Sequence, residues 1–188
     1  MSTLSLDPKK TALVVIDLQN ALMELKTAPH PVADVVRTNR RIAQALRSRG
    51  GLVVWVRVDL NDFLDLPVDQ PPPKRGQMPP ELSEIAPSAG REENDLVMTK
   101  RHWGAFAKTA LEDELKRRGI DTVILTGIST NIGVESTLRQ GAGLGFAFVV
   151  AEDACSGQDG GDHRFAFEKI FPRIARVRAA DEIIEAIG

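Results

Sequence analysis

Short β-branched runs alternate with helical segments along the whole chain, and this alternation most constrains the fold. The runs "TALVVID" at 11–17 and "LVVWVRVD" at 52–59 are apolar almost throughout, as expected for strands buried on both faces. The segment 32–50 instead has apolar residues at roughly helical spacing, and it ends at two glycines. Strands that alternate with helices form βαβ units and a parallel sheet with both faces covered. The sequence therefore predicts an α/β fold.

The other predicted elements continue this alternation. Strands are expected at 11–17, 52–59, 95–100, 121–127, 146–153 and 175–178. Helices are expected at 32–50, 106–119, 132–145, 163–171 and 180–188.

The segment 60–94 interrupts the alternation. It contains "PVDQPPPKRGQMPP", and proline at this density resists both helix and sheet. We expect an extended excursion over the surface. A loop of this length in a compact domain is usually functional or disordered, and a passive spacer is the alternative.

Composition narrows the classes of function. A length of 188 residues favours a single domain that spans 1–188. A net charge of −2 argues against a nucleic-acid binder. No apolar run reaches the roughly 18 residues that cross a bilayer, and the N-terminus lacks the pattern of a signal peptide. The single cysteine, Cys155, permits no internal disulfide, which fits a reducing compartment. We expect a cytoplasmic protein without nucleic-acid or membrane partners.

Candidate functional residues follow the strands, because ligands of open α/β sheets bind beyond the carboxyl ends of the strands. Asp17 directly follows "LVVI", where burial would raise its pKa and suit it to proton transfer. The alternative is that Asp17 caps the next segment. Gln19, two residues further on, is a candidate for the substrate pocket. Arg57, near the end of the second strand, is a candidate partner for an acidic substrate or a member of a structural ion pair.

Lys100 ends the third strand after "LVMT" and can pair with a carboxylate from a neighbouring strand end. The alternative is a solvated surface lysine. The following "RHWGAF" supplies His102 as a possible donor and Trp103 as an aromatic wall. Both are candidates for the substrate pocket.

The turn after the fourth strand, "GISTNIGVEST", is the third candidate region. Asn131 can cap the helix that begins there, and the free N–H groups of a first helical turn attract anions. Gly133 costs about 1 kcal/mol of helix propensity relative to alanine, a cost often accepted where a ligand must approach the backbone. An incidental glycine is the alternative.

Together these motifs resemble those of a known protein family. "TALVVIDLQN", the stretch from "KRHWGAF" through "GISTNIGVEST" to "VVAEDACSG", and the tail around Pro172 together resemble the isochorismatase-like hydrolases, also called the cysteine hydrolase superfamily. The resemblance covers residue 11 to the C-terminus apart from 60–94. It implies a single-domain three-layer α/β/α sandwich, Rossmann-like, with a six-stranded parallel sheet of order 3-2-1-4-5-6. It also implies a homo-oligomer, either dimer or tetramer, that acts on a small molecule.

The resemblance also assigns roles to residues. The family's catalytic aspartate and lysine fall on Asp17 and Lys100, and its nucleophilic cysteine falls on Gly133. A non-proline cis peptide of the family falls on Ile128–Ser129, which would turn the N–H groups of Ser129 and Gly133 toward the pocket. The metal ligands of the nicotinamidases, which follow the second strand, have no counterpart after Asp59, so neither a metal nor a cofactor is expected.

The glycine at position 133 excludes the family's thiolate chemistry there, and Cys155 follows the fifth strand as a small buried residue rather than a substitute nucleophile. True isochorismatases resemble this chain in combining the aspartate and lysine with a glycine. The resemblance to these enzymes implies acid-catalysed hydrolysis of a vinyl ether, with Asp17 as the proton donor. Two alternatives remain: a binding protein without activity, and an amidase with a different nucleophile.

Overall fold

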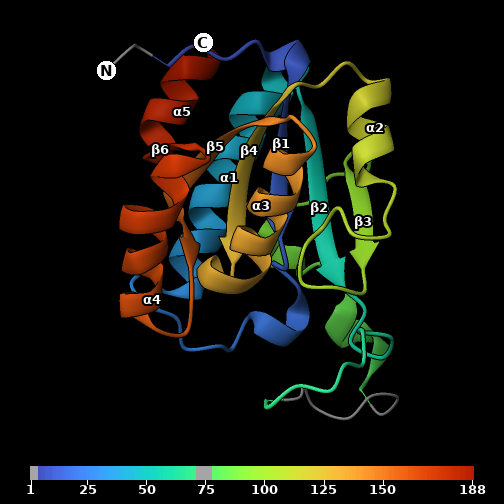
Figure 1. Cartoon of the computed structure of the whole chain (residues 1–188). Helices are drawn as coiled ribbons and strands as arrows, with labels where there is room; N and C mark the ends of the chain where they lie inside the picture. The colour runs from blue at the N-terminus through green and yellow to red at the C-terminus, as the bar shows by residue number, and fades with distance from the viewer. Residues whose placement is uncertain (1–3, 71–77) are drawn as a thin grey trace.

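The computed structural model describes residues 4–70 and 78–188. Six strands form one sheet in the order β3-β2-β1-β4-β5-β6, and every neighbouring pair is parallel (Figure 1). The strands are β1 Thr11–Ile16, β2 Leu52–Val58, β3 Leu96–Lys100, β4 Thr122–Ile128, β5 Ala147–Ser156 and β6 Arg176–Arg178. The predicted fold class and strand order are confirmed.

Helices cover both faces of the sheet. They are α1 Val32–Ser48, α2 Leu111–Arg117, α3 Glu135–Gly143, α4 Gly160–Phe165 and α5 Ala180–Ile187. Helices α1 and α5 pack on one face, and α2, α3 and the turn after α4 pack on the other, so the layers run helix, sheet, helix (Figure 1). Within the described residues no helix combines the length and apolar character needed to cross a membrane.

Strand β1 lies in the middle of the sheet, and all six of its residues are buried. Leu13 and Val15 join the core beneath α1, whereas Val14 and Ile16 join the core beneath α3. Side chains that alternate between two covered faces require apolar residues at every position. This explains why the sequence of β1 shows no polar alternation.

Two predicted helices have different bounds in the structure. The helix expected at 106–119 begins only at Leu111, because Lys108 adopts a left-handed backbone (φ 54°) that an α-helix cannot contain. The helix expected at 163–171 begins earlier, at Gly160, where Asp159 caps it by accepting the N–H groups of Gly161 and Asp162.

The described part of the excursion, 60–70 and 78–94, is more ordered than predicted. It contains short 3₁₀ turns at Pro80–Ser83 and Pro87–Ala89, and Ala86 and Ala89 are buried in the fold. The Asn61 side chain bridges its two arms by donating to Met78 O (2.9 Å) and accepting from Met78 N (3.1 Å). The expectation of a wholly extended surface segment was therefore wrong for these residues.

Gly127 lets β4 approach the end of β1. Its φ is +118°, and a Cβ atom there would lie 2.1 Å from the carbonyl oxygen of Ile16. The register between β4 and β5 also shifts between Leu125 and Gly127. Only glycine fits this position, which brings the turn after β4 next to the residue that follows β1.

A charged cluster fastens α1 to the edge of the sheet. The Asp95 carboxylate accepts hydrogen bonds from Arg47 Nε (2.9 Å), Arg47 Nη2 (2.5 Å), Trp55 Nε1 (2.8 Å) and Glu92 N (2.9 Å). Burial alone would raise the pKa of Asp95, but the hydrogen bonds from Arg47, Glu92 and Trp55 hold it below its usual value.

The substitution Asp95→Asn should lower the free energy of unfolding at pH 7 by about 2 kcal/mol, because hydrogen bonds to a charged group are lost. The pKa of Asp95 is lower in the folded state. Its contribution is therefore present above the unfolded pKa of about 3.9 and is lost as the pH falls through the folded value. Urea unfolding from pH 7 to pH 3 should show a shallower acid dependence in the variant.

The matched control is Asp181→Asn, which removes an exposed ion pair with Arg41. Exposed pairs contribute about 1 kcal/mol or less, so this variant should stay close to the wild type. Equal losses in the two variants would contradict the importance of the Asp95 cluster.

Candidate active site

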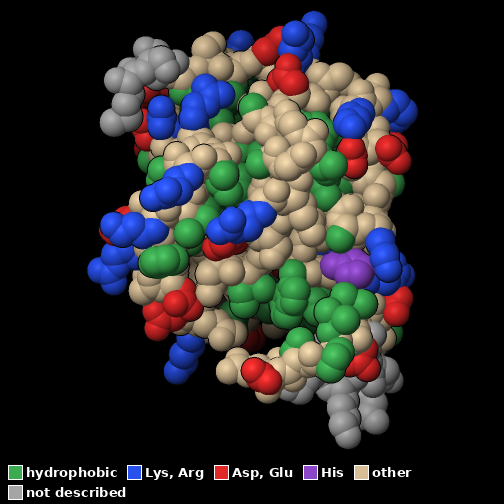
Figure 2. All heavy atoms as spheres, in the orientation of Figure 1, with side chains coloured by type: hydrophobic (Ala, Val, Ile, Leu, Met, Phe, Trp, Pro, Cys, Tyr) green, Lys and Arg blue, Asp and Glu red, His purple; other side chains and the backbone are tan. Residues whose placement is uncertain are grey.

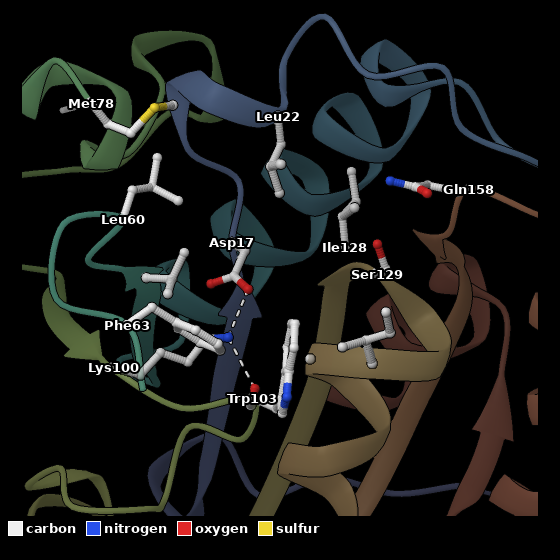
Figure 3. Close-up of a pocket in the computed structure, with 13 residues that line it drawn as sticks. Asp17, Leu22, Leu60, Phe63, Met78, Lys100, Trp103, Ile128, Ser129 and Gln158 are labelled. Carbon is white, nitrogen blue, oxygen red and sulfur yellow. Dashed lines mark hydrogen bonds and ion pairs between the residues drawn. The ribbon is translucent and has the colours of Figure 1, made fainter. Parts of the chain in front are cut away.

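A pocket of about 430 Å³ opens at the carboxyl ends of the strands. Figure 2 shows hydrophobic side chains gathered on this face below α3, beside the described part of the excursion. The pocket is lined by Asp17, Leu22, Val58, Leu60, Phe63, Met78, Lys100, Trp103, Ile128, Ser129, Ile132, Gly133 and Gln158 (Figure 3). The position agrees with the general rule for open α/β sheets.

Asp17 and Lys100 form a buried ion pair in this pocket. Lys100 Nζ lies 2.8 Å from Asp17 Oδ2 and donates a second hydrogen bond to the carbonyl oxygen of Trp103 (3.0 Å) (Figure 3). The two residues are only 7% and 1% exposed. The alternatives of a helix-capping Asp17 and a solvated Lys100 therefore do not hold.

The backbone of Asp17 adopts a left-handed conformation, with φ 56°. A residue other than glycine in this region stores about 1–3 kcal/mol of strain, and such residues concentrate at functional sites. The backbone of Asp17 is held by its N–H, which donates to Val56 O (2.9 Å), and by its carbonyl, which accepts from Gln19 N (2.8 Å). The strand end thus aims the carboxyl group into the pocket.

The second carboxyl oxygen, Asp17 Oδ1, is buried and has no hydrogen-bond partner among the described residues. A buried oxygen without a partner destabilises a carboxylate much more than a protonated carboxyl group. Burial raises the pKa of Asp17, and the charge and hydrogen bond of Lys100 oppose this rise without cancelling it. The effect of burial on the pKa of Asp17 is therefore larger than the opposite effect of Lys100.

Gly133 lies directly beside this pair. A Cβ atom at position 133 would be 3.3 Å from Asp17 Oδ2, 3.5 Å from Lys100 Nζ and 3.0 Å from Ile16 Cγ2. Any side chain here would project against the ion pair, so the glycine leaves this corner of the pocket open.

The turn that carries Gly133 is a π-helical turn, Thr130–Val134, ahead of α3. Val134 N donates to Ser129 O (3.2 Å), and Thr137 Oγ1 donates to Gly133 O (2.7 Å). The peptide Ile128–Ser129 is cis, as the resemblance implied, and both of its residues line the pocket.

Two predicted pocket residues have structural partners instead. Gln19 is fully buried; its side chain accepts from Val58 N (2.8 Å) and donates to Val58 O (3.3 Å) and Leu82 O (3.2 Å). Arg57 forms an ion pair with Glu84 and donates to Thr99 Oγ1 (3.0 Å). Neither lines the pocket, and both bind groups that the sequence pattern could not pair with them.

Asn131 does not cap a helix; its side chain donates to Asp162 Oδ2 (3.0 Å) at the surface. His102 lines a neighbouring groove rather than the pocket. Trp103 does line the pocket: it is half-exposed and packs edge-on against Phe63, with ring centroids 4.8 Å apart.

The excursion supplies pocket walls that the sequence did not predict. Leu60, Phe63 and Met78 all line the cavity, so the excursion is no passive spacer. Their apolar character was the available signal. The apolar residues at 60–66 stand in a segment otherwise rich in charge and proline.

Free cationic side chains are scarce in the described part of the pocket. Lys100 already binds Asp17, and Arg101 lies outside the pocket, where it pairs with Asp62 and lies 3.9 Å from Asp59 Oδ2. Two further cationic residues of the excursion, Lys74 and Arg75, fall outside the described residues.

Comparison with known proteins identifies the family of this chain. The family model "Isochorismatase domain" matches residues 11–182. The chain belongs to the isochorismatase family. It is 45% identical to the uncharacterised isochorismatase family protein YecD of Escherichia coli O157:H7, across 98% of this chain and 100% of that protein.

Other relatives of the isochorismatase family support the same assignment. The ureidoacrylate amidohydrolase RutB of Klebsiella pneumoniae is 31% identical, over 81% of this chain and 75% of that protein. The structure of an isochorismatase family protein from Burkholderia thailandensis superposes with a TM-score of 0.93 at 38% identity, covering 99% of both chains. The protein is thus an isochorismatase-family hydrolase by sequence and fold.

The substitution Lys100→Met should raise the pKa of Asp17 further, because the lysine is the group that lowers it. Carbon-13 NMR of labelled aspartate carboxyl groups would follow the titration of Asp17. The control is Lys116→Met, which removes an exposed pair with Glu112 and should leave this titration unchanged. A pKa of Asp17 that falls or stays constant in Lys100→Met would contradict the electrostatic description of the pair.

Proposed function

We propose that this protein hydrolyses a small vinyl-ether-type substrate by acid catalysis, with Asp17 as the proton donor. One observation carries the proposal: a buried carboxyl group with a raised pKa and one unpartnered oxygen lies in the wall of a pocket. A general acid needs its proton near neutral pH, and burial is the means by which proteins retain it.

The proposed reaction proceeds in three steps. The Asp17 carboxyl group gives its proton to the terminal vinyl carbon, and the ether carbon becomes an oxocarbenium ion. Water attacks this carbon and returns one proton to the Asp17 carboxylate, which yields a hemiketal. The hemiketal collapses to a ketone and an alcohol, so the net change is the addition of one water molecule. No covalent enzyme intermediate is formed.

Lys100 has a positioning and electrostatic role in this proposal. Its ammonium group binds Asp17 Oδ2 and is itself fixed by Trp103 O. It stabilises the carboxylate that exists between the two proton transfers, when the pocket would otherwise hold an unpaired buried charge. Burial therefore raises the pKa of Asp17, and Lys100 limits this rise.

The lining of the pocket indicates the class of substrate. The walls are mainly apolar and include Leu22, Leu60 and Phe63, whereas Ser129 and Gln158 contribute polar groups. The cation that the described lining contains is already paired with Asp17. This favours a substrate with an apolar body and at most one carboxylate over a dianion.

The first alternative function is amide hydrolysis, the activity in the name of the relative RutB. It needs a nucleophile, and Gly133 has no side chain. Cys155 is fully buried, and burial raises the pKa of its thiol, so a thiolate is disfavoured. Among the residues that line the pocket, Ser129 carries the hydroxyl group that could replace it.

The second alternative is ligand binding without turnover. The unpartnered Asp17 Oδ1 would then serve as an acceptor for a ligand N–H or O–H group. This alternative predicts saturable binding of small acids or ethers with no product.

The substitution Asp17→Asn should abolish turnover of enol ethers, because an amide cannot give up a proton at neutral pH. A panel of aryl and alkyl enol ethers of short keto acids would be followed by proton NMR in D₂O. The mechanism requires one deuteron at the former vinyl carbon. Asp113→Asn, an exposed carboxylate on α2, is the control and should retain wild-type turnover.

The pH dependence of the wild type gives a further check on the same reaction. The acid form of Asp17 is the active form, so kcat/KM should fall as the pH rises through its raised pKa. Full activity of Asp17→Asn would overturn the mechanism. Binding of the panel without product in the wild type would favour the ligand-binding alternative.

Gly133→Cys tests the nucleophile-equivalent position separately. The new side chain would project against Asp17 and Lys100, after a shift of the Ile16 methyl group. We expect the variant to lose activity on enol ethers because the corner beside Asp17 is filled. We also expect alkylation of the new thiol by iodoacetamide, read by mass spectrometry, with Gly133→Ala as the unreactive steric control.

A further inference from the structure

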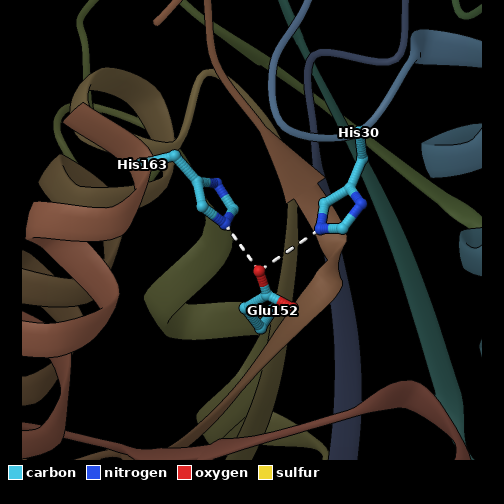
Figure 4. Close-up of side chains that lie close together, drawn as sticks. All are labelled: His30, Glu152 and His163. Atoms are coloured by element: carbon cyan, nitrogen blue, oxygen red, sulfur yellow. Dashed lines mark hydrogen bonds and ion pairs between the residues drawn. The ribbon is translucent and has the colours of Figure 1, made fainter. Parts of the chain in front are cut away.

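A second cluster of functional side chains lies outside the pocket. His30 precedes α1, Glu152 belongs to β5 and His163 belongs to α4, and Figure 4 shows both imidazole rings pointing at the carboxylate. His163 Nε2 lies 2.9 Å from Glu152 Oε1, and His30 Nε2 lies 3.3 Å from the same oxygen. None of the three lines the pocket that contains Asp17.

The spacing of these atoms matches a metal coordination shell. One ligand atom from each of the three residues lies within 4.8 Å of the other two. Zinc holds histidine nitrogens and carboxylate oxygens at about 2.0–2.2 Å, which places neighbouring ligand atoms of a tetrahedral site roughly 3.3 Å apart. The two nitrogen–oxygen separations are already close to this value, so an ion requires only small side-chain movements.

The second ring nitrogen of His163 has its own partner. His163 Nδ1 lies 2.8 Å from Thr130 Oγ1, and both side chains are buried. Histidines that bind metals usually donate this second N–H to an oxygen, which fixes the tautomer and the ring orientation. With Nδ1–H donated to Thr130, the Nε2 lone pair faces the Glu152 carboxylate, an arrangement that a cation stabilises.

The backbone around His30 is also held in place. His30 N donates to Ser156 Oγ (3.2 Å), and Thr27 Oγ1 donates to His30 O (2.7 Å). The N–H of Ala28 donates to Gly157 O (2.8 Å), and the N–H of Gly157 donates to Ala28 O (3.2 Å). The cluster therefore joins segments that the hydrogen bonds of the fold hold in place.

Solvent reaches the cluster from one side. The side chains of Glu152 and His30 are 41% and 29% exposed, whereas that of His163 is 2% exposed. An ion can reach the three ligand atoms through the open side, and water can complete its coordination there.

We propose that His30, Glu152 and His163 bind one divalent transition-metal ion of the zinc class. Two imidazoles and one carboxylate suit zinc and its neighbours in the first transition row better than calcium or magnesium, which prefer all-oxygen ligands. The ion links the segment before α1, strand β5 and helix α4. Through Thr130 it also braces the turn that carries Gly133.

The expectation that no metal binds rested on a different place in the chain. It considered ligands after the second strand, where none follows Asp59. In the proposed site His30 lies more than a hundred residues before Glu152 and His163, so no short sequence motif indicated it.

The test measures zinc binding directly and needs no substrate. Untagged protein is freed of metal by dialysis against a chelator and titrated with Zn²⁺ in a calorimeter at pH 7. We expect one ion per chain with a Kd below about 1 μM, near −8 kcal/mol. His30→Gln and Glu152→Gln should each weaken binding by at least about 100-fold, and Thr130→Val by about 10- to 100-fold.

The matched control is His102→Gln, because His102 is the remaining histidine of the chain and lies outside the cluster. Its affinity for Zn²⁺ should equal that of the wild type. Circular dichroism establishes that each variant is folded. The wild type provides a readout that needs no variant: saturating Zn²⁺ should raise its Tm by several degrees.

Three results would each overturn the proposal. The first is the absence of saturable zinc binding by the wild type up to about 1 mM, a free energy weaker than about −4 kcal/mol. The second is an equal loss of affinity in His102→Gln and His30→Gln. The third is unchanged affinity in both His30→Gln and Glu152→Gln, which would mean that the histidines and the carboxylate form only hydrogen bonds with one another.

Discussion

The buried pair of Asp17 and Lys100 is the interaction on which the pocket depends. Asp17 directly follows β1 and Lys100 ends β3, and these strands do not pair with each other because β2 lies between them. A buried lysine without its carboxylate would be strongly destabilising, so the three strand ends must keep their register. The sheet does this through the alignment of Val58 with Lys100 and the hydrogen bond from Asp17 N to Val56 O. Sheet geometry and acid strength are therefore set by the same contacts.

The glycine at position 133 leaves the space beside this pair free of a side chain. If a thiol stood beside Asp17, the carboxyl group would exchange a proton with that thiol. Here that corner is open, and Asp17 keeps an oxygen without a partner among the described residues. The relation to an amidohydrolase such as RutB therefore establishes shared architecture and ancestry, whereas the proposed chemistry rests on what the chain itself places beside Asp17.

The sequence predicted those features that depend on local patterns. Asp17 and Lys100 could be located because polar residues directly follow apolar strands, and the strand order followed from the resemblance to the isochorismatase family. Gln19 was misassigned, and the choice between the two roles of Arg57 stayed open, because their partners, Leu82 and Glu84, lie in a segment without periodicity. The group formed by His30, Glu152 and His163 was invisible for a related reason. His30 lies more than a hundred residues before Glu152 and His163, so no short sequence motif contains all three residues.

The two arms of the excursion are closed by the hydrogen bonds between Asn61 and Met78. The entropic cost of closing a loop grows only slowly with its length, so the loop between Asn61 and Met78 can lengthen with little loss of stability. Leu60, Phe63 and Met78 stand at the closure and face the pocket, whereas Asp17 and Lys100 stand on the sheet. Selection can therefore reshape the apolar wall of the pocket while the ion pair of Asp17 and Lys100 beneath it stays unchanged.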